Sequence, residues 1–208
     1  MNVVLYGASG MVGSRVLNEL LARGHQVTAV VRHPSKLPAT KATVKTGDVL
    51  SASSVAETAA GADAAISSYA PPASDTDKII DSVKSLAAGL KQAGVKRFIM
   101  VGGAGSLEVA PGVKLEDVTA FPADYKAIAH SHTTALAQLK TADLDWTSFS
   151  PAALIQPGER TTKFRLALDT LVADAQGNSQ ISAEDYATAL VDELENPKHI
   201  RQRFTIGY

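Results

Sequence analysis

The sequence predicts a doubly wound α/β fold, in which helices cover both faces of a parallel sheet and a small C-terminal extension lies on the substrate side. An apolar run opens the chain and breaks into three evenly spaced glycines before a helical pattern begins. Extended apolar runs then alternate with helical patterns as far as residue 150. Two of these runs end in glycine-rich turns, and the carboxyl ends of parallel strands meet at one ligand-binding edge. We therefore expect a single domain, with a core over residues 1–150 and an extension over 151–208.

The first strand is expected to end at Tyr6, and the first helix is expected to run from Met11 to Ala22. Between them, three glycines allow a tight turn, a close approach of phosphate and close packing of the helix. The N-terminus of that helix offers unpaired N–H groups to the phosphate. The interval between the first two glycines is longer than in the usual dinucleotide fingerprint. The predicted phosphate-binding residues are Gly7, Ser9, Gly10, Met11, Val12 and Gly13.

The second strand is expected over residues 26–31, and the basic segment Arg32-His33-Pro34-Ser35-Lys36 follows it. A domain that binds NAD usually has Asp or Glu here, about 20 residues after the glycines, to bind the ribose 2′-hydroxyl. Arg32, His33 and Lys36 could instead surround a 2′-phosphate. The segment therefore favours NADP(H), with NAD(H) as the other cofactor to consider. A solvated basic loop is the alternative interpretation.

The rest of the chain continues the alternation of strands and helices and then departs from it. Strands are expected over residues 42–46, 63–69, 96–101, 145–150 and 203–207, and helices over 51–60, 75–92, 125–139 and 182–195. The long loop 107–123 is expected to form part of a substrate wall. Extended segments around Gln176-Gly177-Asn178 suggest a hairpin over the site. Glu159 and Arg160 are expected to form a local ion pair.

Strand ends supply further candidate cofactor-binding residues at the ligand edge. Asp48 could accept a hydrogen bond from an adenine amino group, with Val49 against the ring, or it could be a helix-entry turn residue. Tyr69 could cover a ring or simply pack, and Lys126 could reach the nicotinamide ribose or a substrate anion. The full set beyond the glycine loop is Arg32, Asp48, Val49, Ser68, Tyr69, Gly102, Gly103, Ala104, Lys126, Pro151, Ala152 and Ala153.

The composition excludes several classes of function. The chain has 208 residues, of which 45% are hydrophobic, and no cysteine, so disulfides, thiolate metal sites and a cysteine nucleophile are excluded. A formal net charge of −1 provides no basic field for nucleic acid. No apolar run approaches the roughly 18 residues of a membrane span. We expect a cytoplasmic protein without a metal site that acts on a small-molecule substrate rather than on nucleic acid or a membrane. The sequence leaves the oligomeric state open.

Four segments together resemble those of a known family. They are Gly7-Ala8-Ser9-Gly10-Met11-Val12-Gly13, Gly47-Asp48-Val49, Val101-Gly102-Gly103-Ala104-Gly105-Ser106-Leu107 and Pro157-Gly158-Glu159-Arg160-Thr161. The chain resembles the atypical short-chain dehydrogenase/reductase superfamily, and within it the NmrA-like proteins described as NADH-flavin reductases; biliverdin reductase B is a more distant likeness. The resemblance implies a Rossmann-like domain with an NAD(P)H site, and reduction of a flavin or a quinone. Related NmrA proteins bind the dinucleotide as regulators without turning it over.

The proton relay of a carbonyl-reducing member of this superfamily is not in place. Such an enzyme uses Tyr as proton donor, a Lys four residues later to lower its pKa, and a Ser that holds the substrate oxygen. Here Lys126 follows Tyr125 directly, about 100° away around the helix, and Ala129 takes the usual lysine position. Gly102 and Gly103 stand where the serine is expected. Sugar epimerisation, which needs that tyrosine, is therefore disfavoured.

Flavin reduction needs fewer catalytic side chains, because hydride passes directly between stacked rings and the protein only orients the rings and excludes water from between them. The candidate catalytic residues are His132, Lys126 and Tyr125. The likeness to biliverdin reductase B places a histidine roughly where His132 lies, and a histidine there could protonate a reduced flavin or orient a substrate. Alternatively, His130 and His132 are surface residues, and their spacing of two does not form a metal pair.

Two functions remain to be distinguished. The main hypothesis is an NAD(P)H-dependent oxidoreductase that prefers NADPH and passes hydride to a flavin or quinone-like acceptor, so that flavin is a substrate. The alternative is a non-catalytic NAD(P)-binding redox sensor of the NmrA type.

Overall fold

A central sheet of eight strands organises the protein in the computed structural model, which describes residues 1–208 apart from the side chain of Lys36. From edge to edge the strands are β10 (Arg165–Ala167), β12 (Gln202–Gly207), β8 (Asp145–Ser150), β5 (Arg97–Val101), β4 (Ala64–Ser67), β1 (Asn2–Tyr6), β2 (Gln26–Val31) and β3 (Thr43–Thr46). All pair in parallel except β10, which is antiparallel to β12. The strand order reverses between β1 and β4, so the predicted doubly wound, Rossmann-like fold is confirmed.

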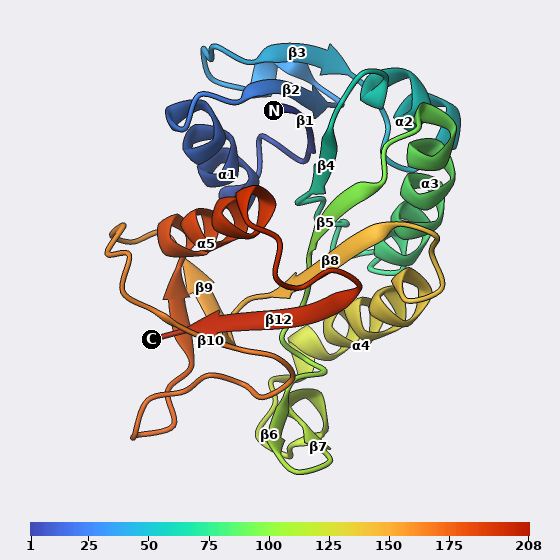
Figure 1. Cartoon of the computed structure of the whole chain (residues 1–208). Coiled ribbons are helices and arrows are strands. Elements are labelled where there is room, and N and C mark those ends of the chain that lie inside the picture. Colours follow the sequence, from blue (N-terminus) through green and yellow to red (C-terminus); the bar gives the residue numbers. More distant parts are fainter.

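Helices cover both faces of this sheet (Figure 1). On one face lie α1 (Met11–Ala22) and α5 (Ala183–Glu195), and on the other lie α2 (Ala52–Ala59), α3 (Lys78–Ala93) and α4 (Ala123–Leu139). Successive side chains of a strand point to opposite faces. In β1, Val3 and Leu5 accordingly belong to the core beneath α1 and α5, whereas Val4 and Tyr6 belong to the core on the other face. The sheet is therefore buried on both sides, as parallel sheets usually are.

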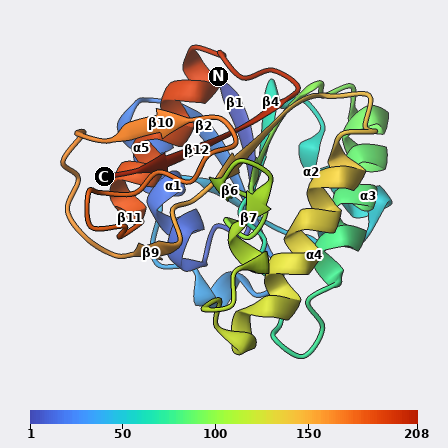
Figure 2. The same cartoon turned by 90° about the horizontal axis from the view of Figure 1, so that it is seen from below.

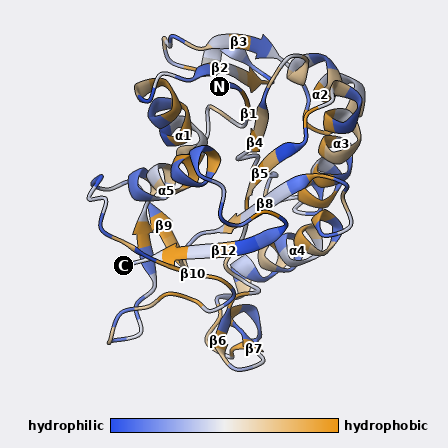
Figure 3. Ribbon diagram, in the orientation of Figure 1, coloured by the Kyte–Doolittle hydropathy of each residue, from blue (hydrophilic) through white to orange (hydrophobic). Residues whose placement is uncertain are grey.

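Local signals in the sequence start the helices where expected. Ser51 caps α2 by accepting a hydrogen bond from the Ser54 amide at 3.3 Å, and Ser182 caps α5 in the same way through the Asp185 amide at 3.0 Å. Each helix carries both hydrophobic and hydrophilic residues, so that its apolar side can be buried against the sheet (Figure 3).

The loop predicted over residues 107–123 contains ordered structure that the sequence pattern did not reveal. β6 (Glu108–Ala110) and β7 (Val113–Lys114) form a short hairpin, and a 3₁₀ turn, η2 (Leu115–Asp117), follows it. Gly112 lies in the hairpin turn with φ 73°, a left-handed conformation that favours glycine. The hairpin lies beside α4 in both views of the molecule (Figures 1 and 2).

The predicted hairpin around Gln176-Gly177-Asn178 is wrong. A turn does form at Gly177, where the Asp174 carboxylate accepts hydrogen bonds from the Gln176 and Asn178 amides at 2.9 and 2.8 Å. Its flanks pair elsewhere, because β10 joins the open edge of β12 and β11 (Gln180–Ser182) pairs in parallel with β9 (Leu154–Gln156). Unpaired strand edges accept any suitable segment, and a local turn does not decide between them. The closing strand β12 itself lies in the main sheet beside β8.

Candidate functional site

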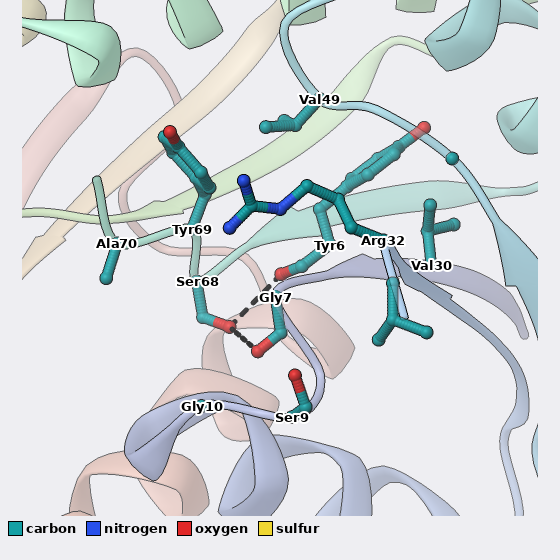
Figure 4. A pocket seen from close by; sticks show the side chains of 12 residues that line it. Tyr6, Gly7, Ser9, Gly10, Val30, Arg32, Val49, Ser68, Tyr69 and Ala70 are labelled. Carbon is teal, nitrogen blue, oxygen red and sulfur yellow. Dashed lines mark hydrogen bonds between the residues drawn. The ribbon is translucent and has the colours of Figure 1, made fainter. Parts of the chain in front are cut away.

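The glycine loop joins β1 to α1 at the point where the strand order reverses. Gly7 has φ 81°, and a Cβ there would lie 2.6 Å from the Ser68 carbonyl oxygen. A Cβ on Gly13 would lie 2.1 Å from the Gly7 carbonyl oxygen and 2.4 Å from Ser68 Oγ. Ser68 Oγ donates to the carbonyl oxygens of Tyr6 and Gly7 at 3.1 and 3.2 Å (Figure 4). Glycine is therefore required at positions 7 and 13 by the packing of the protein itself.

Gly10 differs from the other two glycines of the loop. A Cβ there would meet only the Gly7 carbonyl oxygen, at 3.4 Å, and the residue is exposed. Gly10 is also the N-cap of α1, without a side-chain capping bond, and the first turn of α1 carries no acidic residue. The helix N-terminus thus keeps its amides open to an anion. Because packing does not require glycine at position 10, this glycine fits the close approach of a ligand.

A cavity of about 160 Å³ lies beside the glycine loop, at the ends of β1, β2 and β4 (Figure 4). Of the predicted cofactor-binding residues, it is lined by Gly7, Ser9, Gly10, Arg32, Val49, Ser68 and Tyr69. Met11 is exposed, Val12 packs on the core, and Gly13 is buried in α1. Tyr6 also lines the cavity and was not predicted to do so, although its place as the last residue of β1 could have indicated it.

Arg32 supplies the cation of this cavity. It follows β2 directly, is exposed, and its guanidinium points across the cavity toward Tyr69 (Figure 4). The hydrogen bonds drawn in Figure 4 run from Ser68 to Tyr6 and Gly7, and the Arg32 guanidinium makes none with the described residues that line the cavity. His33 is exposed beside it, and the side chain of Lys36 lies outside the described part of the chain.

Of two further predicted residues, Tyr69 lines this cavity and Asp48 does not. Asp48 is exposed, and its Oδ1 accepts a hydrogen bond from the Leu50 amide at 2.9 Å, so the turn role is present; the contact with adenine stays a prediction. Tyr69 is half-buried, and its hydroxyl has no hydrogen-bond partner among the described residues. Burial raises the pKa of Tyr69 above its usual value.

A second and larger pocket, of about 580 Å³, lies at the ends of β5 and β8. This is within the range of about 300–1,000 Å³ that small-molecule sites occupy. Its walls come from the turn after β5, the segment that runs from η2 into α4, one face of α4, and the turn after β8. The lining residues are Gly103, Ala104, Gly105, Leu115, Val118, Ala120, Phe121, Pro122, Tyr125, Ile128, Ala129, His132, Pro151, Ala152, Ala153, Leu154 and Ile155. No charged side chain is among them.

The second pocket contains most of the residues predicted near the nicotinamide. Gly102 is buried and does not line the pocket, and its amide donates to the Phe149 carbonyl oxygen at 2.7 Å. Lys126 is exposed and does not line the pocket, whereas Tyr125 lines the rim with 63% of its surface exposed. The α4 residues at 125, 128, 129 and 132 share one helix face. That spacing was visible in the sequence and could have identified the α4 wall.

His132 lies deeper in this pocket than a surface residue would. A Cβ on Gly103 would lie 2.8 Å from the Cβ of His132, so the glycine allows the imidazole to pack against the turn after β5. His132 Nδ1 is buried and has no hydrogen-bond partner among the described residues. Burial lowers the pKa of His132 to about 4, so the ring is neutral at neutral pH. A neutral imidazole orients a substrate better than it donates a proton to one. His130 is exposed.

The predicted ion pair between Glu159 and Arg160 is wrong. The Arg160 guanidinium bonds to Glu19 of α1 at 2.8 Å, and the Glu159 carbonyl oxygen accepts from Ser182 Oγ at 2.7 Å. Glu184 accepts both from the Gly158 amide at 2.7 Å and from Arg15 of α1 at 2.9 Å. Residues 158–160 therefore connect the start of α5 to α1, which is a contact between distant parts of the chain.

Both pockets lie at the carboxyl ends of adjacent parallel strands, so an extended dinucleotide along this edge would reach from one to the other. Every helix among the described residues is too short or too polar to span a lipid bilayer.

The chain is similar to known proteins over nearly its whole length. The model of an NAD(P)H-binding family matches residues 7–197. An uncharacterized protein of Bacillus subtilis, YwnB, is 36% identical over 210 residues, which cover 99% of this chain and 98% of that protein.

Two solved structures share the fold throughout. A candidate epimerase from Bacteroides thetaiotaomicron is 47% identical, with a TM-score of 0.94 and coverage of 100% of this chain and 96% of that chain. A candidate NADH-flavin reductase from Streptococcus pneumoniae is 32% identical, with a TM-score of 0.89 and coverage of 100% and 99%. The two names give different chemistry to one fold, so function has to be argued from the site.

Proposed function

Because the chain belongs to the NAD(P)H-binding family, we propose that it is a reductase that prefers NADPH to NADH and passes hydride to a flavin or quinone-like acceptor. The observation that carries this proposal is the second pocket, which is large, apolar and placed beside the cavity of the glycine loop. An apolar pocket of this kind suits the stacking of two flat rings and excludes water from between them.

The residues present fit a dinucleotide. The open N-terminus of α1 and Gly10 would hold the pyrophosphate. Arg32 would bind the 2′-phosphate, because a guanidinium without a partner in its cavity can form charge-assisted hydrogen bonds with a phosphate. Val49 and Tyr69 would contact the adenosine, and Gly103 with Pro151 would flank the nicotinamide. A bound NADPH supplies a hydride at the nicotinamide C4.

The chain's own contribution to the reaction is orientation and dryness. Gly103, Ala104 and the turn after β8 present small or rigid surfaces against which rings can lie flat, and the α4 wall closes the other side. The neutral imidazole of His132 lines the pocket and would contact and orient the acceptor. The proton that accompanies the hydride would come from solvent at the rim near Tyr125, because no acidic side chain lines the pocket among the described residues.

Carbonyl reduction and epimerisation fit the site less well. Both need a tyrosine whose pKa is lowered by a neighbouring lysine. Tyr125 is 63% exposed, and Lys126 next to it is exposed outside the pocket, so neither is held for that task.

The test is NADPH consumption by the purified protein with riboflavin, FMN and menadione, measured beside a binding titration of NADPH. We expect NADPH to be oxidised in the presence of at least one of these acceptors. Tight binding of NADPH without oxidation in any mixture would instead support the non-catalytic sensor. A UDP-sugar incubated with NAD⁺ serves as the epimerase control, and we expect no conversion.

A further inference from the structure

We propose that the acceptor is an uncharged ring system, such as riboflavin or an uncharged quinone, and that the site gains no affinity from the phosphate of FMN. This inference rests on the proposed function, because it concerns the molecule that is reduced in the second pocket.

The first observation is the absence of charge in the lining. All of the described residues that line the second pocket have neutral side chains, and the only titratable rings among them are those of His132 and Tyr125. Burial keeps His132 neutral at neutral pH, because its pKa falls to about 4. Nothing in the lining can therefore form an ion pair with a phosphate or a carboxylate.

The second observation is the sign of the charges behind the walls. The wall segment 115–126 contains three acidic residues, Glu116, Asp117 and Asp124, and one basic residue, Lys126. Glu116 faces inward, where its Oε1 accepts from Thr133 Oγ1 at 3.0 Å and its Oε2 is buried. The opposite wall, residues 150–158, contains no charged residue. A phosphate near the rim would meet a net negative wall.

The third observation is that groups suited to phosphate are gathered in the other cavity. Arg32 and the N-terminus of α1 both border the glycine loop, where the phosphates of the dinucleotide are expected. The ligand edge thus has a cationic end for the cofactor and an uncharged end for the acceptor.

The redox step balances without a further reagent. NADPH loses a hydride and becomes NADP⁺, and the oxidised flavin ring gains that hydride and one proton from solvent to give dihydroriboflavin. A quinone gains the same two electrons and two protons to give the hydroquinone.

Riboflavin and FMN are the matched probes, because they differ only by the phosphate. Their binding to the protein saturated with NADP⁺ is measured by quenching of flavin fluorescence at low and high salt. We expect FMN to bind about threefold more weakly than riboflavin at low salt, with a smaller difference at high salt because salt screens the repulsion. Tenfold tighter binding of FMN would overturn the inference, and so would a selective loss of FMN binding in Lys126→Ala.

A substitution at the rim provides a gain-of-function test. Leu154 lines the pocket and is 48% exposed, so Leu154→Arg can place a guanidinium at the rim without burying it. We expect the affinity for FMN relative to riboflavin to rise about fivefold, the effect of one exposed charge pair. Leu166→Arg is the control, because Leu166 is 49% exposed on β10 and lines a different depression. An equal change in both variants, or none in Leu154→Arg, would contradict the placement of the acceptor.

The two proposals fail in different ways. If neither flavin nor menadione supports NADPH oxidation, the proposed reductase is wrong. If FMN is reduced in clear preference to riboflavin, the reductase stands and the inference about charge falls.

Discussion

Substitution of Gly13 should lower the stability of the protein, whereas substitution of Gly10 should weaken the binding of NADPH. In Gly13→Ala the new Cβ would lie 2.1 Å from the Gly7 carbonyl oxygen, a backbone atom that cannot rotate away. Helix α1 would have to shift, which typically costs about 1–3 kcal/mol in the free energy of unfolding. In a chain of this size, each kcal/mol lowers the melting temperature by about 2–4 °C. We therefore expect Gly13→Ala to melt several degrees below the wild-type protein.

In Gly10→Ala the new Cβ would meet only the Gly7 carbonyl oxygen, at 3.4 Å, an ordinary contact. We expect its free energy of unfolding to stay within about 0.5 kcal/mol of the wild-type value. The methyl group would instead stand where the pyrophosphate approaches α1, so the Kd for NADPH should rise about tenfold or more, which corresponds to about 1.4 kcal/mol. Thermal melts without ligand and a calorimetric titration with NADPH separate the two effects. Unchanged NADPH binding in Gly10→Ala would refute the assignment of this loop to the phosphates.

Three further substitutions test separate parts of the site and its support. Arg32→Ala should lower the affinity for NADPH about 10- to 100-fold, the effect of losing a charge-assisted hydrogen bond to phosphate, and should change the affinity for NADH by no more than about twofold. Equal losses of affinity for both cofactors in binding titrations would refute the NADP preference. The pKa of His132 falls from 6.5 to about 4 on folding, so protonation favours the unfolded chain and the free energy of unfolding falls as the pH drops from 6.5 toward 4. Between these pH values, the free energy of unfolding of His132→Gln, measured in urea melts, should therefore fall by about 1–3 kcal/mol less than that of the wild-type protein. If the free energies of the two proteins changed in parallel with pH, the ring would not be buried. Asp185→Ala removes an acceptor that holds the Thr162 amide and the Tyr208 hydroxyl, both at 2.8 Å, and should cost about 2–4 kcal/mol in the same assay; a loss under about 0.5 kcal/mol would contradict that role.

The sequence predicted the elements whose causes are local. The apolar run before Gly7, the glycine spacing and the amphipathic pattern that follows placed β1, the loop and α1, and the bounds of α1, β2 and β8 match the prediction. The resemblance to an NAD(P)-binding family was also confirmed, by the family match over residues 7–197. These features depend on neighbouring residues or on motifs, both of which can be read in order along the chain.

The features that were missed depend on distant partners. The turn at Gly177 was visible, but its flanks pair with β12 and β9, which no local pattern specifies. Arg160 finds its partner in Glu19, 141 residues away, rather than in its neighbour. The burial of His132 results from the missing side chain at Gly103 on another strand end. The apolar lining of the second pocket is assembled in the same way from three separate segments, residues 103–105, 115–132 and 151–155.

A crystal structure of the protein with NADP⁺ tests the central claim most directly, namely that one dinucleotide lies along the sheet edge from the glycine loop to the apolar pocket. We expect the pyrophosphate at the N-terminus of α1, the 2′-phosphate against Arg32, and the nicotinamide between Gly103 and Pro151 with its C4 facing the pocket. A nicotinamide that lies outside this pocket, or a 2′-phosphate that does not contact Arg32, would contradict the claim.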